Sequence, residues 1–220
     1  MANAAILREQ VQSALGNRWE AAFGTKKQDF TEAIRSAVGE VPRGTLTEVS
    51  GPASSGRTTF LYALLAAVSG AQEFCALIDA DDAFDPSSAM AAGVRLSQVL
   101  WVRCGGNVEH ALKAADLLSQ AGGFGIVALD LADSPARQTR RIPLASWFRL
   151  RHGVENTRTA LVAIGQQIHA PSCSTLKIEL RRERVLWRGQ LPARLFQGVE
   201  ITARRTRNHR SDEAPFTFLR

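Results

Sequence analysis

Residues 45–65 read TLTEVSGPASSGRTTFLYALL, and this stretch decides the fold. A short strand pattern leads into a turn of glycine and serine, and an apolar helical run follows. Gly51 and Gly56 enclose four residues, and Arg-Thr-Thr follows at 57–59. The spacing is that of the phosphate-binding loop G-x-x-x-x-G-K-[ST], the P-loop, with arginine in place of lysine. A strand before the loop and a helix after it favour a nucleotide-binding α/β domain over a chance turn.

The residue types of this loop suit an anion. Glycine lets backbone N–H groups approach phosphate oxygens with no Cβ in the way, and the positive end of the following helix adds to the same site. The Thr58 hydroxyl would bind Mg²⁺. We therefore predict that the following residues bind the nucleotide: Gly51, Ser54, Ser55, Gly56, Arg57, Thr58 and Thr59.

Arg57 is the one departure from the motif, and it bears on the chemistry. Lysine places a compact ammonium among the phosphates, whereas a guanidinium is planar, bulkier and prefers to bond in pairs along an edge. We expect nucleotide binding to tolerate this exchange better than fast hydrolysis does.

The composition is that of an ordinary globular domain. The 220 residues are enough for one domain with a substantial core, and 45% are hydrophobic and 22% charged. No apolar run reaches the length of a membrane span, and the first residues lack the basic start and apolar core of a secretion signal. The three cysteines, Cys75, Cys104 and Cys173, show no metal spacing. We expect a cytoplasmic protein with reduced thiols and no membrane contact.

Charge is unevenly divided along the chain. Residues 1–130 hold 10 Lys/Arg against 14 Asp/Glu, a net of −4, and residues 131–220 hold 17 against 7, a net of +10. A basic second half favours an acidic partner surface or weak, electrostatic binding of DNA. A solvated arginine-rich face is the alternative, since exposed strands often carry arginine.

The order of strand and helix patterns predicts the architecture. Their alternation indicates a doubly wound, mainly parallel sheet flanked by helices, and strand patterns without helices after Pro171 indicate antiparallel strands at the C-terminal edge. Helices at 2–16 and 28–38 would form an N-terminal arm or cap over residues 1–40, beside a core domain over 41–220. After the first strand we expect strands at 73–79, 98–104, 125–130, 159–165, 176–182, 184–187, 199–205 and 216–219, and helices at 87–93, 108–120 and around Trp147 and Phe148.

Asp130 ends the apolar strand pattern GIVALD, and an aspartate there, downstream of a P-loop, is typical of the Walker B position that organises Mg²⁺. With the loop, further segments fall in the order seen in the RecA recombinase family, which the chain resembles over about residues 40–220. The resemblance implies a RecA-like P-loop core. Its segments are 48–59 with the loop, the acidic strand end 78–86, the Walker B strand 126–130, Gly-Gln-Gln-Ile at 165–168 and the arginine-rich 201–216.

The resemblance also implies roles for individual residues. Asp81 occupies the position of the glutamate that activates the attacking water, and Gln167 that of the residue that senses the γ-phosphate, so both would be catalytic. Asp85 would contact the adenine, and Thr58 and Asp130 would hold Mg²⁺. If the chain binds a nucleotide, the resemblance implies ATP and Mg²⁺ as its cofactors. The alternative that it binds no cofactor stays open. The cations that reach a neighbouring subunit's nucleotide would be among Arg204, Arg205 and Arg207.

The departures from the family pattern all weaken its nucleotide chemistry or its hold on DNA. Besides Arg57, the shorter Asp81 leaves its carboxylate about one methylene short of the family's glutamate, and Ser88 replaces a tyrosine that stacks on the adenine. Only a short loop with Pro171 stands where the family has its long DNA-holding loop. This pattern resembles a shortened accessory protein of the ImuA type. That likeness implies a role in the bacterial SOS response and in mutagenesis by error-prone translesion synthesis.

The same likeness implies partners. A translesion polymerase-like protein of the ImuB type would be the main one, with RecA, weakly held DNA and further copies of this chain beside it. Two surfaces suit a protein partner: the apolar stripe Ile6, Leu7, Val11 and Leu15 of the first helix, and the strand edge with Arg181, Arg182, Arg184 and Arg188. The first stripe could instead pack on its own core.

Two other functions stay open at this point. One is an ATP-dependent recombinase that binds single-stranded DNA, and the other is a P-loop kinase or small NTPase. Arg57 counts against both, and the short loop counts against the recombinase. Whether the chain hydrolyses ATP at all is left open.

Overall fold

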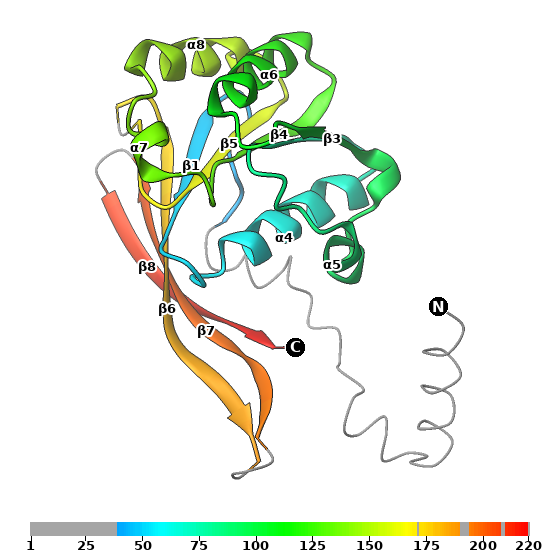
Figure 1. Ribbon diagram of the computed structural model, residues 1–220, viewed down its shortest axis with the longest axis vertical. Coiled ribbons are helices and arrows are strands. Elements are labelled where there is room, and N and C mark those ends of the chain that lie inside the picture. Colours follow the sequence, from blue (N-terminus) through cyan, green and yellow to red (C-terminus); the bar gives the residue numbers. More distant parts are fainter. Residues whose placement is uncertain (1–38, 171, 190–193, 208–209, 220) are drawn as a thin grey trace.

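The computed structural model describes residues 39–170, 172–189, 194–207 and 210–219 (Figure 1). The arm predicted over residues 1–40, with its two helices, therefore lies outside the described part apart from Gly39 and Glu40. No helix in the described part is both long and apolar enough to cross a membrane. The three cysteines are free thiols, and two of them are buried.

One eight-stranded sheet forms the body of the protein, in the order β3-β2-β4-β5-β1-β6-β7-β8. Strands β1 to β6 pair in parallel, and β7 and β8 add antiparallel at one edge. This confirms the predicted mainly parallel α/β sheet with antiparallel strands at its C-terminal edge. The strands are β1 (Leu46–Ser50), β2 (Phe74–Asp79), β3 (Val99–Arg103), β4 (Phe124–Asp130), β5 (Ala160–Gly165), β6 (Leu176–Arg188), β7 (Leu195–Arg207) and β8 (Arg210–Leu219).

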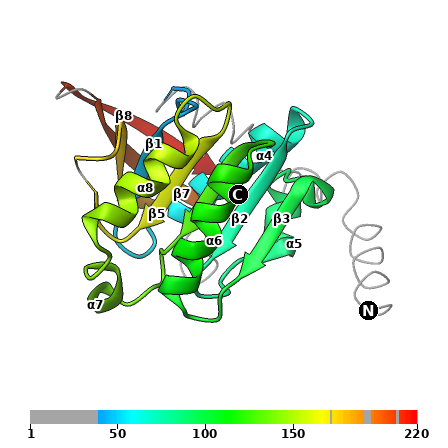
Figure 2. The same cartoon turned by 90° about the horizontal axis from the view of Figure 1, so that it is seen from above.

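Helices cover both faces of the parallel part of the sheet (Figures 1 and 2). Neighbouring strand residues serve different cores: Leu77 packs with Phe60 of α4 on one face, and Ile78 packs with Trp147 of α8 on the other. Because both faces are buried, the central strands are continuous apolar runs. The helices are α4 (Arg57–Gly70), α5 (Pro86–Ala91), α6 (Val108–Ala121), α7 (Ala136–Thr139) and α8 (Leu144–Val154), with a 3₁₀ turn at Leu96–Gln98.

Boundaries differ from the prediction mainly at the antiparallel edge. The patterns at 176–182 and 184–187 belong to one strand, β6, whose register with β7 shifts at Glu183. A bulge residue interrupts the period of two, which is why one strand was predicted as two. Strands β7 and β8 begin earlier than predicted, and β8 contains Pro215, which an edge strand tolerates. Helix α7 had no predicted counterpart.

The carboxyl ends of the parallel strands meet at one edge of the sheet. The glycine loop (residues 51–56) follows β1 there, and Asp79, Asp130 and Gly165 are the last residues of β2, β4 and β5. Ligands of open α/β sheets bind in the crevice outside this edge. The fold therefore brings together segments that are far apart in the sequence.

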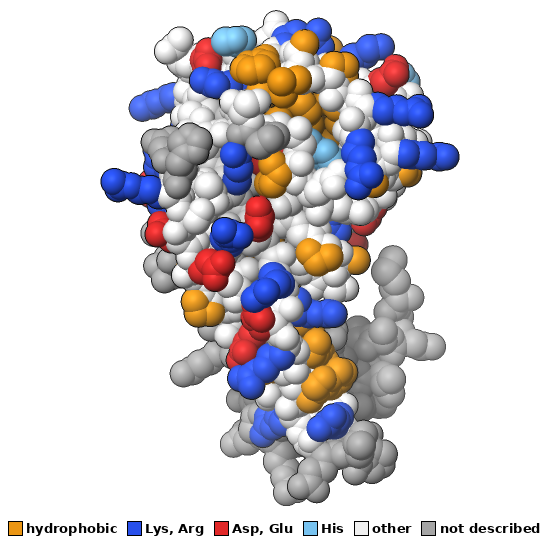
Figure 3. Space-filling view, turned by 90° about the vertical axis from the view of Figure 1, so that its left-hand side faces the viewer, with side chains coloured by type: hydrophobic (Ala, Val, Ile, Leu, Met, Phe, Trp, Pro, Cys, Tyr) orange, Lys and Arg blue, Asp and Glu red, His pale blue; other side chains and the backbone are white. Residues whose placement is uncertain are grey.

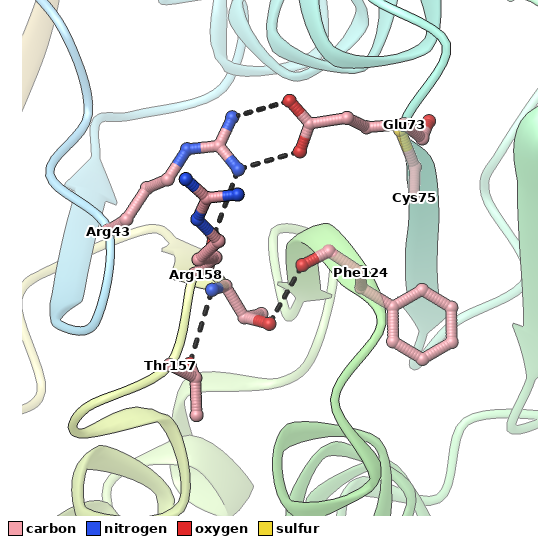
Figure 4. Close-up of polar contacts among 7 residues, drawn as sticks. Arg43, Glu73, Cys75, Phe124, Thr157 and Arg158 are labelled. Carbon is pink, nitrogen blue, oxygen red and sulfur yellow. Dashed lines mark hydrogen bonds and ion pairs between the residues drawn. The ribbon is translucent and has the colours of Figure 1, made fainter.

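A polar network fastens the opposite edge (Figure 4). Arg43 donates to both carboxylate oxygens of Glu73, at 2.6 and 2.8 Å, and to the carbonyl oxygen of Arg158 at 2.9 Å. The hydrogen bond from Arg43 holds the pKa of Glu73 below its usual value. Thr159 donates to the carbonyl oxygen of Phe124 at 2.7 Å. These contacts tie the chain entering β1 to the starts of β2, β4 and β5, so we assign them a structural role.

Candidate nucleotide site

The glycine loop turns sharply through two left-handed residues. Gly56 has φ 95° and Ser54 has φ 62°, both in the left-handed region. A Cβ on Gly51 would lie 2.5 Å from the carbonyl oxygen of Leu180, because β6 lies against the loop. Only glycine fits at that approach.

Arg57 points into the protein. Its side chain is 7% exposed, and Nη1 donates to the carbonyl oxygen of Ala132 at 2.9 Å. Nε2 of Gln166 donates to the same oxygen at 3.3 Å. The guanidinium is thus tied to the loop that follows β4, 75 residues away in the sequence.

Asp130 lies beside this arginine at the end of β4. Its Oδ1 accepts a hydrogen bond from the backbone N–H of Ala132 at 2.9 Å. Burial raises its pKa to about 6, and the nearby Asp79 carboxylate acts in the same direction, whereas Arg57 lowers it. Near neutral pH the carboxylate is therefore poorly stabilised by the protein alone, a state that a cation would relieve.

Asp81 is tied to the same region by a hydroxyl. The side chain of Ser134, itself buried, donates to its carboxylate. Ser134 lies in the loop after β4, like Ala132, so both predicted acidic residues contact that loop. No sequence motif marks Ser134, and only the tertiary fold assigns it a site position.

Two carboxylates near the site are structural. Asp79 accepts from the backbone N–H groups of Ala83 and Phe84, at 3.0 and 2.9 Å, and from the Trp101 indole at 3.1 Å. Asp82 accepts from Arg103 at 2.9 Å and from the Gly105 N–H at 3.3 Å. These contacts fix the chain around residues 80–85.

Asp85, the residue predicted to contact the adenine, caps helix α5. It accepts from the N–H groups of Ser87 and Ser88 at 3.1 Å each, and from the Ser88 hydroxyl at 2.5 Å. These bonds, the hydroxyl first, lower its pKa. The capping contacts give the aspartate a structural reason to be present, and the adenine contact stays a prediction.

The two adjacent glutamines behave differently. Gln167, predicted to sense the γ-phosphate, accepts a long hydrogen bond of 3.5 Å from Arg140, and both glutamines line a hollow of about 510 Å³ together with Gly51 and Pro52. Gln166, which the sequence did not single out, contacts the acceptor of Arg57. The structure therefore brings Gln166, rather than Gln167, into contact with the group that binds Arg57.

A buried glutamate, also missed by sequence, holds the segment after β5. Oε1 of Glu48 accepts from the N–H groups of His169 and Ala170, at 2.7 and 3.0 Å, and Oε2 has no partner. Burial lowers the pKa of His169, whose ring stacks on Trp147. This clamp fixes the short connection from β5 to β6.

The loop keeps features that suit a phosphate. No side chain caps the start of α4, and the Ser55 hydroxyl is buried without a partner. The exposed Thr58 and the carboxylate of Asp130 carry oxygens of the kind that Mg²⁺ takes when phosphate supplies other ligands. No group of three or more metal-ligating side chains occurs among the described residues. The backbone thus fits a phosphate, while the cation of the loop is already engaged with Ala132.

Comparison with known proteins shows which family the chain matches. Residues 22–141, more than half of the chain, match the RecA N-terminal domain. Proteins named RecA are among its relatives: that of Deinococcus radiodurans is 42% identical over 93 residues, or 42% of this chain and 25% of the relative. That of Borrelia hermsii is 39% identical over 99 residues, or 45% and 27%. That of Chloroflexus aurantiacus is 26% identical over 188 residues, or 71% and 53%.

These matches cover about a quarter to a half of the relatives' length. What a whole relative does is therefore not carried to this chain by the match alone.

Proposed function

The chain belongs to the RecA family, and from that premise we propose that it is a non-recombinase accessory protein with a degenerate ATP site. It would act in the bacterial cytoplasm as part of the SOS response. There it would support error-prone translesion synthesis through contacts with proteins. In this it is similar to the ImuA type.

The inward contact of Arg57 carries the proposal. A cation that serves phosphoryl transfer must face the phosphates and neutralise charge in the transition state. Here the guanidinium is buried and donates to a backbone carbonyl oxygen 2.9 Å away. Turning it outward would break that bond, so it is poorly placed to replace lysine.

The remaining candidate catalytic groups support the same conclusion. The carboxylate of Asp81 is bonded to the Ser134 hydroxyl and sits on a side chain one methylene shorter than glutamate. A misplacement of about 1 Å can lower a rate about 100-fold. Loss of the cation and displacement of the base together favour slow turnover or none.

Nucleotide binding itself remains compatible with the loop. Backbone N–H groups at residues 51–56 and the start of α4 would hold the phosphates, and Thr58 with Asp130 would hold Mg²⁺. Bound Mg²⁺ would neutralise phosphate charge there. Binding without turnover would make ATP a structural ligand or a conformational signal.

The partners follow from the same proposal. The short connection 166–175, clamped by Glu48, leaves little chain for an ordered grip on DNA. A polymerase-like protein of the ImuB type, with RecA as a second contact, fits a family member that acts as a binding surface. DNA contact would be weak and electrostatic, from the net +10 of residues 131–220.

An ATP-dependent recombinase that binds single-stranded DNA is the second candidate function. It is favoured by the names of the relatives and opposed by Arg57, Asp81 and the short connection. The family match leaves a P-loop kinase or small NTPase without support.

The test restores the family residues. We expect ATP turnover by the wild type far below the enzyme-typical value, on the order of 10 per second, with or without single-stranded DNA. The double change Arg57→Lys and Asp81→Glu should raise it. The matched control makes the same two exchanges at exposed positions, Arg137→Lys in α7 and Asp212→Glu in β8, and should leave turnover unchanged. Enzyme-typical turnover by the wild type would refute the proposal.

A further inference from the structure

The loop that follows β4 is held by side chains from two other elements. Residues 131–135, which we call the β4 loop, run from the end of β4 to the start of α7. The carbonyl oxygen of Ala132 accepts a hydrogen bond from Arg57 of α4 at 2.9 Å and another from Gln166, just after β5, at 3.3 Å. One backbone oxygen therefore joins the helix of the glycine loop and the end of β5 to the β4 loop.

Further contacts fix the same loop on either side of Ala132. The Ser134 hydroxyl donates to the carboxylate of Asp81, in the segment after β2. The backbone N–H of Leu131 donates to the carbonyl oxygen of Ile164 in β5 at 2.9 Å. Leu131 and Ser134 are each 1% exposed. Groups of the protein itself, from α4, β5 and the end of β2, thus supply the contacts that hold the β4 loop.

The β4 loop sets the position of a basic helix. Pro135, the last residue of the loop, is the N-cap of α7, and the C-cap residue Arg140 donates to Gln167 at 3.5 Å. Figure 3 shows Lys and Arg side chains over the upper part of the molecule, where Figure 1 places α7 and α8. The exposed arginines on or just after α7 are Arg137, Arg140 and Arg141. A movement of the β4 loop would therefore move this basic surface.

The cation of a P-loop ordinarily serves a nucleotide. Its lysine reaches the phosphates, and the phosphates with their Mg²⁺ hold neighbouring loops that are released when the terminal phosphate is lost. In this protein the guanidinium of Arg57 is 7% exposed and bonds directly to the β4 loop. The cation that would otherwise act on the loop through a phosphate acts on it without one.

We propose that Arg57 is an internal pin: its guanidinium replaces a bound nucleotide in fixing the β4 loop, so the loop and α7 keep one position with or without ATP. The inference rests on the proposed function in treating the ATP site as degenerate. It adds how that site acts on its surroundings, which is to keep a basic surface in constant form. ATP bound at the glycine loop would then be a structural ligand, and no signal would pass through the β4 loop.

Phosphate binding does not require the pin to open. Backbone N–H groups of the glycine loop and of the uncapped start of α4 suit phosphate oxygens without a side-chain cation. Turning Arg57 outward would break its 2.9 Å bond to Ala132, and hydrogen bonds from a charged donor are among the stronger ones. It would also take the guanidinium away from Asp130, whose pKa Arg57 lowers. The inward position is therefore the stable one.

Hydrogen exchange of backbone N–H groups in the full chain tests the proposal. The readout is a peptide that covers residues 131–141, and a peptide from α6 (Val108–Ala121) of the same protein is the reference. The nucleotide probe is AMP-PNP, an ATP analogue that resists hydrolysis, with Mg²⁺. We expect the probe to change the exchange rate of residues 131–141 in the wild type by less than about twofold.

Variants of Arg57 release the loop. Arg57→Met removes the guanidinium and should speed exchange at residues 131–141 by about tenfold or more, with little change in the α6 peptide. Arg57→Lys keeps a positive charge on a shorter side chain that falls short of Ala132. It should also speed exchange there, and the probe should slow it again. The control Arg95→Met removes an exposed arginine before the 3₁₀ turn and should change neither peptide.

Thermal melting of each variant establishes that it is folded. Arg57→Lys keeps the charge of the wild type, so it carries the test should Arg57→Met not fold.

Four results would overturn the proposal. The first is equal exchange at residues 131–141 in the wild type and the Arg57 variants. The second is a wild-type change of more than about twofold with AMP-PNP and Mg²⁺, which would make the loop a nucleotide-dependent switch. The third is equal acceleration of both peptides, which would give Arg57 only a general part in stability. The fourth is an Arg57→Lys loop that the probe does not slow.

ATP turnover enters none of these readouts. Failure of the internal pin is therefore distinct from failure of the proposed function, which turnover decides.

Discussion

Replacing Arg57 by methionine probes the contact on which the proposed function depends. Methionine keeps much of the apolar stem but removes the guanidinium that donates to Ala132 at 2.9 Å. A hydrogen bond from a charged group contributes about 1.5–3 kcal/mol. Two effects reduce the net loss: a buried charge disappears, and the carbonyl oxygen keeps Gln166 as a second donor. We expect the free energy of unfolding to fall by about 1–2 kcal/mol.

The same change has an electrostatic signature. Arg57 lowers the pKa of Asp130, so its removal should move that pKa upward from about 6. A general loss of packing would not give this second effect, which makes the pair of readouts specific to the inward orientation.

Two assays measure the outcome. Urea unfolding at pH 8 gives the stability change, and a fall in melting temperature of about 2–8 °C corresponds to it in a domain of this size. NMR titration of the Asp130 carboxyl gives the pKa. The control Arg137→Met removes an exposed arginine of helix α7 and should alter neither. An Arg57→Met protein with wild-type stability and an unchanged Asp130 titration would refute the inward contact.

Three further predictions concern residues around the loop. Glu48→Ala strips the N–H groups of the half-buried His169 and the buried Ala170 of their acceptor and should lower stability by about 2–4 kcal/mol, seen in urea unfolding, while Glu48→Gln keeps most of it. Gly51→Ala should cost about 1–3 kcal/mol, because the new Cβ meets the Leu180 carbonyl oxygen; equal melting temperatures would disprove the close approach. The raised pKa of Asp130 means that the folded state binds its proton more tightly, so the contribution of this one group to wild-type stability is largest below about pH 4 and declines by up to about 3 kcal/mol as pH rises through 6. Asp130→Asn should lack this decline, and parallel pH profiles would contradict it.

Much of the fold was predictable because it depends on local periodicity. The apolar runs that end in Asp79 and Asp130 become parallel strands buried on both faces, and the loss of helical patterns after Pro171 marks the antiparallel edge. Strand β6 was predicted as two pieces because a bulge at Glu183 breaks the alternation that identifies a strand. The register of β7 beyond that bulge depends on the tertiary fold, and no local sequence pattern indicates it.

The candidate site was predictable in its residues but not in their contacts. The loop spacing singles out Arg57, yet its acceptor is a backbone carbonyl 75 residues away, and backbone groups carry no sequence signature. Glu48 has the sequence appearance of an ordinary strand charge, and burial alone makes it a clamp. Gln166 and Gln167 are neighbours of the same residue type, and only the tertiary fold gives them different partners, the Ala132 carbonyl oxygen for Gln166 and Arg140 for Gln167.

Homologous strand exchange by the wild-type chain is the most direct measurement. The assay supplies single-stranded DNA, homologous duplex DNA, ATP and Mg²⁺, with a RecA protein as the positive control. We expect no strand-exchange product from this chain alone, and only weak single-strand binding that falls steeply as salt rises. Efficient, ATP-dependent strand exchange by the purified chain would contradict its assignment as a non-recombinase member of the family.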